Sequence, residues 1–150
     1  MDSPAASRPS FIRVVAICVF RQDDRILVFE GFDERKNSYF YRPLGGGVEA
    51  GETSEVAVCR EIREEVGAEV TDLRLLGVIE NIFTVNGRAG HEIVFVYDGR
   101  FVEQHLYTQE SFMIYEDNGA SLRASWRALD SFNDYHRLVP PELFGLFEEL

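Results

Sequence analysis

The stretch from Gly46 to Ala68, GGVEAGETSEVAVCREIREEVGA, constrains this chain more than any other part of it. It begins with a glycine-rich turn and continues into a predicted helix that carries Glu61, Glu64 and Glu65. At about 100° per residue, these three carboxylates fall within an arc of about 100° on one face of the helix. Carboxylates this close repel one another, so we expect a compensating charge, and Mg²⁺ suits the role because it prefers oxygen ligands and brings phosphates with it. The stretch therefore predicts metal-assisted cleavage of a phosphate ester or anhydride.

The residues beside the acidic arc predict where this helix begins, ends and packs. Thr53 has the side chain of an N-cap, the helix is expected to run to about Val66, and Gly67 is placed to follow it as the C′ residue. Apolar residues form a second arc next to the acidic one: Val58, Cys59, Ile62 and Val66. We expect one face of the helix to pack and the adjacent face to carry the chemistry.

Composition limits the class of protein. The chain has 150 residues, of which 45% are hydrophobic, and this suits one core; we expect residues 1–10 to be a flexible tail and residues 11–150 to be a single domain. A formal net charge of −11 lacks the basic footprint of nucleic-acid binders, so we expect a small-molecule partner and no large nucleic acid. The apolar run Val14–Phe20 is too short to cross a bilayer, and we predict no membrane association. Cys18 and Cys59 lie among apolar residues, which favours reduced thiols and a cytoplasmic location.

The order of strands and helices predicts an α/β fold. The first strand, Phe11–Phe20, is apolar at nearly every position from Val14 onward, so we expect both of its faces to be covered in a layered arrangement. Further strands are expected at Arg25–Phe32, Ser38–Arg42, Leu73–Val85, Glu92–Val102 and Leu122–Ala128. We interpret Asn86-Gly87 as a hairpin turn, residues 103–119 as a long polar loop, and the segment after Pro140-Pro141 as an amphipathic helix.

The opening stretch also fits the pattern G-x5-E-x7-R-E-U-x-E-E-x-G-U, in which U is a bulky aliphatic residue. The positions that match are Gly46, Glu52, Arg60, Glu61, Ile62, Glu64, Glu65 and Gly67. The last position holds Ala68, which is smaller than the pattern prefers. On these residues the chain resembles the Nudix hydrolases. The resemblance implies an α+β fold, an α/β/α sandwich with a mixed β-sheet between helices, from about residue 11 to the C-terminus.

The resemblance also implies roles for the residues of the box. Glu61, Glu64 and Glu65 would ligate Mg²⁺ or Mn²⁺, with the carbonyl of Gly45 as a further ligand. Arg60 would pair with a box carboxylate such as Glu52, which would itself support the junction between loop and helix. The base that activates water stays open: in some relatives it is a box glutamate, here Glu61 or Glu64, and in others a glutamate outside the box. The candidates outside the box are Glu92, Glu110 and Glu116.

Residues outside the box are candidates for substrate binding. Arg42 can reach a phosphate, although an exposed arginine at a strand end is an equally good interpretation. Tyr39 and Tyr41 can stack on a base, but alternating aromatic residues in a strand more often pack in the core. Glu116 lies in the predicted loop and is a candidate for contact with the substrate as well.

The resemblance implies hydrolysis of a nucleoside diphosphate linked to a group X, giving a nucleotide and X-phosphate. Markers of the ADP-ribose, dinucleoside polyphosphate, NADH and coenzyme A branches are missing, so we expect a (deoxy)nucleoside triphosphate or a broad range of substrates. The alternative is a catalytically inactive Nudix-fold ligand sensor or interaction domain. A homodimer is a further expectation, because many relatives pair.

Overall fold

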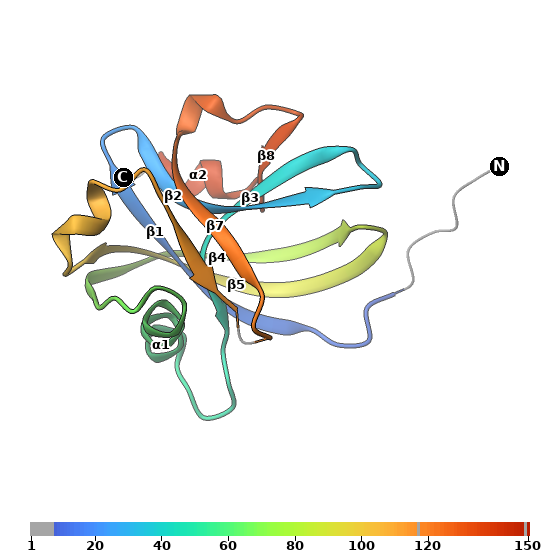
Figure 1. Cartoon of the computed structure of the whole chain (residues 1–150). Coiled ribbons are helices and arrows are strands. Elements are labelled where there is room, and N and C mark those ends of the chain that lie inside the picture. Colours follow the sequence, from blue (N-terminus) through green and yellow to red (C-terminus); the bar gives the residue numbers. More distant parts are fainter. Residues whose placement is uncertain (1–7, 117, 149) are drawn as a thin grey trace.

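The computed structural model describes residues 8–116, 118–148 and 150, so residues 1–7 of the predicted tail lie outside it. The strands are β1 (Arg13–Gln22), β2 (Arg25–Asp33), β3 (Ser38–Gly47), β4 (Val70–Val85), β5 (Arg88–Phe101), β6 (Ser111–Tyr115), β7 (Ser121–Ala128) and β8 (His136–Leu138) (Figure 1). The helices are α1 (Ser54–Val66) and α2 (Leu143–Phe147), with short 3₁₀ turns at Gln104–Tyr107 and Leu129–Ser131. None of the helices in these residues is long and apolar enough to cross a membrane.

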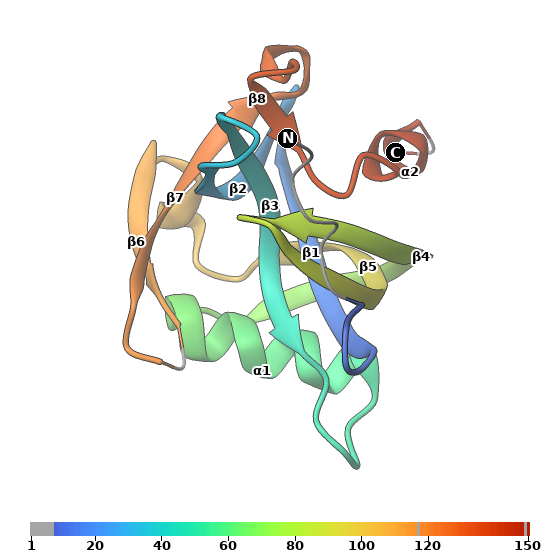
Figure 2. The ribbon, with the colours of Figure 1, turned by 90° about the vertical axis from the view of Figure 1, so that its right-hand side faces the viewer.

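The strands form one mixed sheet in the order β4-β5-β1-β3-β2-β7-β6, with β8 attached to β3. β1 lies near the middle, where it pairs in parallel with β5 and antiparallel with β3. The sheet is strongly bent, and the β2–β3 and β4–β5 hairpins extend side by side beyond the rest of the molecule (Figures 1 and 2). The predicted mixed sheet is confirmed.

Residues of β1 alternate between two cores. Ala16, Cys18 and Phe20 belong to the core that α1 covers, whereas the intervening residues Val15, Ile17 and Val19 belong to the core that contains Leu143 of α2. All six are almost completely buried, as expected of a strand covered on both faces. The sheet therefore lies between helices, which confirms the predicted α/β/α class (Figure 2).

Helix α1 has the boundaries that its sequence predicts. The Thr53 Oγ1 accepts a hydrogen bond from the Val56 amide at 3.2 Å, and Gly67 ends the helix in the left-handed region at a φ of 73°. Ala57, Val58 and Ile62 are fully buried against the sheet. Val58 and Ile62 each contribute about 1.5–3 kcal/mol by leaving water, so packing fixes the rotation of α1 and thereby the direction of its acidic face.

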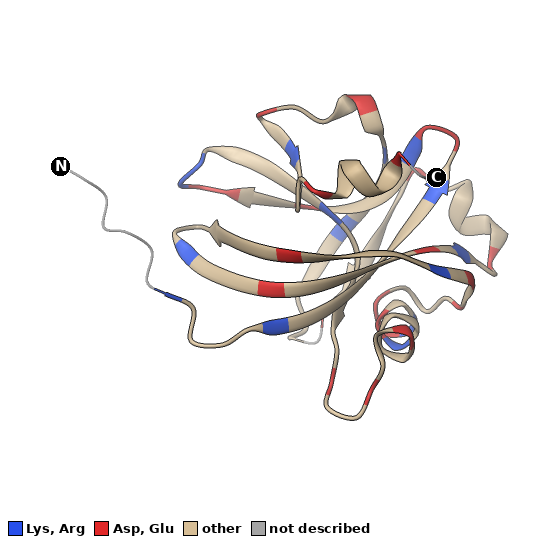
Figure 3. Ribbon diagram, turned by 180° about the vertical axis from the view of Figure 1, so that it is seen from behind, with Lys and Arg blue, Asp and Glu red and all other residues tan. Residues whose placement is uncertain are grey.

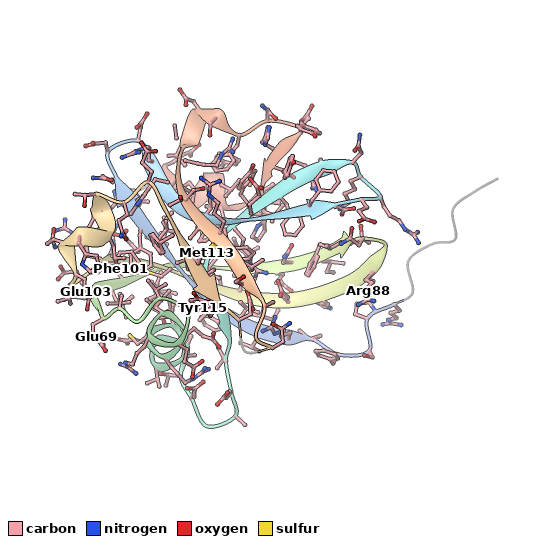
Figure 4. All side chains as sticks on the ribbon, viewed as in Figure 1. Glu69, Arg88, Phe101, Glu103, Met113 and Tyr115 are labelled. Carbon is pink, nitrogen blue, oxygen red and sulfur yellow. The ribbon has the colours of Figure 1, made fainter. Side chains whose placement is uncertain are left out.

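Two segments differ from the prediction. The glycine run is not a free turn: β3 continues through Pro43 to Gly47, because Gly45, Gly46 and Gly47 pair with β1. Residues 103–119 are not one polar loop, because they contain a 3₁₀ turn and β6. Ile114 of β6 is fully buried, whereas Met113 and Tyr115 are exposed on the other face (Figure 4).

The tips of the two long hairpins are joined by hydrogen bonds. Asn86 lies at the predicted β4–β5 turn, and its side-chain oxygen accepts from the Glu34 amide at 2.8 Å. The Lys36 ammonium donates to the carbonyl of Thr84 at 2.7 Å. These bonds hold the β2–β3 hairpin against the β4–β5 hairpin at their outer ends.

Candidate active site

Arg60 is the centre of a cluster that we call the Arg60 cluster, formed with Glu52, Glu61 and Glu64. Its Nε and Nη2 donate to the two Glu52 oxygens at 2.7 and 2.8 Å, so the pair is bidentate as predicted. Its Nη1 lies 3.1 Å from Glu61 and 3.2 Å from Glu64. Arg60 also donates to the carbonyl of Gly47 at 3.0 Å, which ties the helix to the end of β3. One guanidinium thus supplies positive charge to the acidic arc.

Arg60 stabilises the ionised form of Glu52. The hydrogen bonds from Arg60 lower the pKa of Glu52 to about 2, with help from the Glu49 amide. The same bonds raise the pKa of the Arg60 guanidinium. At neutral pH Glu52 is therefore a carboxylate paired with a permanently charged arginine.

Glu61 approaches the backbone of β3 so closely that a side chain at Gly46 would displace its carboxylate. A Cβ added to Gly46 would lie 2.4 Å from the carboxyl carbon of Glu61. Glu61 and Glu65 are 7% and 5% exposed, whereas the Glu64 side chain is 44% exposed. On the acidic face, Glu61 and Glu65 are therefore buried, whereas Glu64 is exposed to solvent.

A small cavity of about 100 Å³ lies where this face meets the sheet. Its lining includes Gly45, Gly46 and Glu61 together with Arg42 and Glu116, so it joins residues from β3, α1 and the turn after β6. Glu116 and Arg42, predicted separately as substrate contacts, are thus brought together with the predicted ligands Gly45 and Glu61.

The donor set suits a hard divalent cation. It consists of the carboxylates of Glu61, Glu64 and Glu65 and the carbonyl of Gly45, all of them oxygen donors. Because Glu61 lies close against Gly46, one of these carboxylates is beside the β3 backbone that lines the small cavity. In the part of the chain that the structure describes, His, Cys, Asp and Glu side chains do not form a group of three that could hold a metal ion. Arg60 draws the Glu61 and Glu64 carboxylates towards itself.

A second network, which we call the Glu92 cluster, consists of Arg13, Arg42, Asn81 and Glu92. Glu92 is 4% exposed and accepts from Arg42 at 2.8 and 3.4 Å and from the Asn81 amide at 3.4 Å. Arg13 lies 3.9 Å away on the other side. Glu92 is therefore an anchor for arginines, and this environment argues against the prediction that it is the base.

The other glutamates proposed as a base are separated by the structure. Glu116 lines the small cavity with Glu61. Glu110 is exposed and does not line that cavity. Its backbone carbonyl accepts a hydrogen bond from the Trp126 amide at 3.3 Å. The structure thus places only Glu116 of these two beside the box.

Tyr41, predicted as a substrate contact, lies in the core. It is 1% exposed, its hydroxyl donates to Glu30 at 2.8 Å, and the Arg127 guanidinium lies 4.3 Å from its ring centre. Burial, followed by the bond to Glu30, raises the pKa of this hydroxyl. Tyr39 is in ring contact with Phe32, Tyr135 and His136, outside the lining of the small cavity. Both tyrosines therefore pack against the core, Tyr41 completely and Tyr39 in part.

Arg13 was missed by sequence reasoning, and the contact of Asn81 with Glu92 was not predicted. Arg13 precedes an apolar strand and Asn81 lies within a long one, so neither has a local motif. Their role depends on register: Arg13 is opposite Glu92 across β1–β5, and Asn81 is opposite Glu92 across β4–β5. A polar residue within an apolar strand was the one available signal.

Comparison with known proteins adds a family and a fold. A model of the NUDIX domain matches residues 10–142. The NAD-capped RNA hydrolase NudC of Pseudomonas aeruginosa (strain LESB58) is 35% identical over 91 residues, which make up 61% of this chain and 28% of that protein. The chain thus spans less than a third of the length of this relative.

Solved structures share the fold over almost the whole chain. A NUDIX hydrolase from Nitrosomonas europaea superposes with a TM-score of 0.61 at 22% identity, covering 93% of this chain and 88% of that one. A MutT NUDIX hydrolase from Burkholderia pseudomallei has a TM-score of 0.55 at 25% identity, covering 94% of this chain and 100% of that one. The arrangement of sheet and helices described above is therefore also found in these two proteins.

Proposed function

The chain belongs to the Nudix hydrolase family, whose members are pyrophosphohydrolases, and we propose that it cleaves the diphosphate of a nucleoside diphosphate linked to a group X. The products would be a nucleotide and X-phosphate. The observation that carries the proposal is the Arg60 cluster, which holds box carboxylates beside the Gly46 backbone at the edge of the small cavity.

Divalent metals are generally used in this family, and we propose Glu61, Glu64, Glu65 and the Gly45 carbonyl as the ligands of Mg²⁺ or Mn²⁺. A bound ion would lower the pKa of a coordinated water and withdraw charge from the bridging phosphates. Arg60 keeps the acidic face in position through its bonds to Glu52 and the Gly47 carbonyl. Arg42 also lines the small cavity, where its charge favours a phosphate.

We assign the general base to Glu116. It lines the small cavity with Glu61, while Glu92 is held by Arg42 and Glu110 lies elsewhere. A carboxylate at this wall can accept the proton of a water that attacks one phosphorus, after which the other phosphate leaves with its substituent. In this assignment Glu61 and Glu64 are metal ligands only, and neither of them is the general base.

The identity of X is the finer part of the proposal. The relative from Pseudomonas aeruginosa is named for hydrolysis of NAD-capped RNA, so a dinucleotide and a nucleotide-capped RNA both belong in any substrate panel. Nucleoside triphosphates, which the missing branch markers favour, belong there too. A cytoplasmic location and a homodimer stay predictions.

The test is a turnover assay with the purified full chain and Mg²⁺. The panel comprises a nucleotide sugar, NADH, ADP-ribose, the four deoxynucleoside triphosphates and an NAD-capped RNA. We expect a nucleotide and X-phosphate as products, with one ¹⁸O from labelled water in one of the two phosphates. If no panel member turns over while calorimetry shows Mg²⁺ binding, the proposal fails.

A further inference from the structure

A large cavity of about 710 Å³ adjoins the small one. Its walls are residues 9–13, on the N-terminal side of β1, and residues 83–92 of the β4–β5 hairpin. Arg13 lines both cavities, and Glu92 of the large cavity bonds Arg42 of the small one. The two spaces therefore meet at the Glu92 cluster. Pro9 and Ser10, predicted as part of a flexible tail, belong to this wall.

The sizes of the two cavities differ in a way that matters for a substrate. Cavities that enclose small organic ligands are about 300–1,000 Å³. The large cavity lies within that range, while the small one, at about 100 Å³, does not. The small cavity has room for the reacting phosphates, so the organic part of the substrate has to lie outside it.

Charge favours an anionic ligand in the large cavity. Its lining contains Arg13 and Arg88, and its one described carboxylate, Glu92, is already bonded to Arg42. Arg88 lies at the tip of the β4–β5 hairpin, beside the N-terminal segment (Figure 4). Basic residues mark both the hairpin tip and the neighbouring end of β1 (Figure 3). This basic wall belongs to a chain whose formal net charge is −11.

Aromatic surface lies in the same cavity. Phe83 and Phe11 both line it, and Phe11 is 69% exposed. The Phe83 ring lies against the backbone of Gly90, where an added Cβ would be 2.3 Å from its Cζ. Gly90 thus leaves room for this ring against β5. Any of the planar nucleobases can stack on such a ring.

We propose that the large cavity binds the nucleoside monophosphate half of the substrate, with its phosphate at Arg13 and its base against Phe83. Glu92 is the positioning residue, because it contacts both Arg42 and Arg13 at the passage where the two cavities meet. The assignment rests on the proposed function, since it places the scissile diphosphate across that passage. It adds the orientation: the nucleoside lies towards the β4–β5 hairpin and X lies on the other side of the metal ligands.

The test measures binding without metal. Full-length protein in EDTA is titrated calorimetrically with AMP, GMP, CMP, UMP, adenosine and inorganic phosphate. We expect the nucleotides to bind more tightly than adenosine or phosphate. Phe83→Leu is expected to weaken nucleotide binding about tenfold and to leave phosphate binding unchanged, because only stacking is lost. Arg13→Gln is expected to weaken both about tenfold.

Matched controls are Phe144→Leu, at a phenylalanine that is 41% exposed beside Phe132, and Arg123→Gln, at an exposed arginine of β7. Neither should change binding. Glu92→Gln is expected to raise KM with little change in kcat, and Glu92→Asp to restore part of the affinity. A purely structural role would lower the apparent kcat through loss of folded protein and leave KM unchanged. Amide shifts on the wild-type protein, largest in residues 83–92 when AMP is added, test the site without any variant.

The outcomes separate this inference from the proposed function. If the enzyme turns over but Phe83→Leu and the wild type bind nucleotides equally, the inference is overturned and the proposed function stands. If nucleotides bind through Phe83 and Arg13 but nothing in the panel turns over, the inference stands and the proposed function fails. Nucleotides that bind no more tightly than phosphate overturn the inference as well.

Discussion

The Arg60 cluster and the Glu92 cluster are both networks of arginine and carboxylate, yet they are built in opposite ways. Arg60 reaches Glu52, Glu61 and Glu64 over eight residues of sequence or fewer. Arg42 and Glu92 are fifty residues apart, and Arg13 joins them from a third strand. The first network is a property of one loop and one helix, while the second exists only when the sheet is complete.

Burial differs between the two clusters as well. The carboxylate at the centre of the Glu92 cluster is 5% exposed at its side chain, whereas Glu64 of the Arg60 cluster is 44% exposed. A buried charge that loses its partner is costly, and an exposed one is rehydrated by water. We therefore expect changes in the Arg60 cluster to lower turnover with little loss of stability, and changes in the Glu92 cluster to lower stability in addition to their effect on substrate binding. The following predictions test this division.

The largest expected effect is on turnover, from Glu64→Gln. The amide removes a charged metal ligand, and we expect turnover to fall on the order of 10³-fold. Because the side chain is half-exposed, the free energy of unfolding should change by less than about 0.5 kcal/mol. Glu55→Gln, at an exposed position in the first turn of α1, is the matched control. Equal losses of turnover in the two variants would contradict the assignment of Glu64.

Arg42→Gln is expected to lower the free energy of unfolding by about 3 kcal/mol, because it leaves Glu92 buried with weaker partners. Urea titration followed by circular dichroism measures the loss. Replacing both residues, Arg42→Met with Glu92→Met, should recover most of it, since no buried charge then remains. A loss below about 1 kcal/mol would mean that the pair behaves like a surface ion pair, and the contrast between the clusters would disappear.

Arg60→Lys tests the expectation for the Arg60 cluster. A lysine keeps the charge but lacks the planar fork that contacts Glu52, Glu61 and Glu64 together. We expect turnover to fall about 10- to 100-fold, as when residues that orient metal ligands are changed. Arg63→Lys, next to the exposed Glu69, is the control and should keep wild-type turnover. Mg²⁺ affinity, measured by calorimetry, should fall in Arg60→Lys alone.

The smallest expected effect is a pH dependence of stability. Folding lowers the pKa of Glu52 from 4.5 to about 2, chiefly through Arg60. The ionised form is therefore favoured in the folded state, so its stabilising effect is complete above pH 4.5 and is lost as the pH falls towards 2. Wild type should be more stable than Glu52→Gln at pH 6, and the difference should shrink through this window. A difference that is constant down to pH 2 would rule out the proposed contact as its cause.

The two clusters also mark how far the sequence could be interpreted. Helix α1 was predicted to its ends because Thr53, Gly67 and the apolar arc are local signals. The pairing of Arg60 with Glu52 was implied by the resemblance of this loop and helix to the Nudix box. The Glu92 cluster could not be predicted, because it depends on the parallel register of β1 with β5, and a shift of one residue would send Glu92 to the opposite face.

Other differences have similar physical reasons. β6 was interpreted as loop because its apolar residues occur on both faces and polar neighbours surround them, so the segment lacks a clear period of two. β8 has three residues, too few for any pattern. Tyr41 was given a binding role because an aromatic residue in a strand has the same appearance whether it faces a ligand or the core.

The bond between Lys36 and the carbonyl of Thr84 has a practical consequence. Lys36 is the only lysine of the chain, so acylation of side-chain amines would modify one position, at the join of the two hairpin tips. A reagent that neutralises this ammonium would remove its bond to Thr84 and leave the bond between Glu34 and Asn86 in place. The rate at which this single amine is modified could thus report how often the Lys36 bond opens in solution.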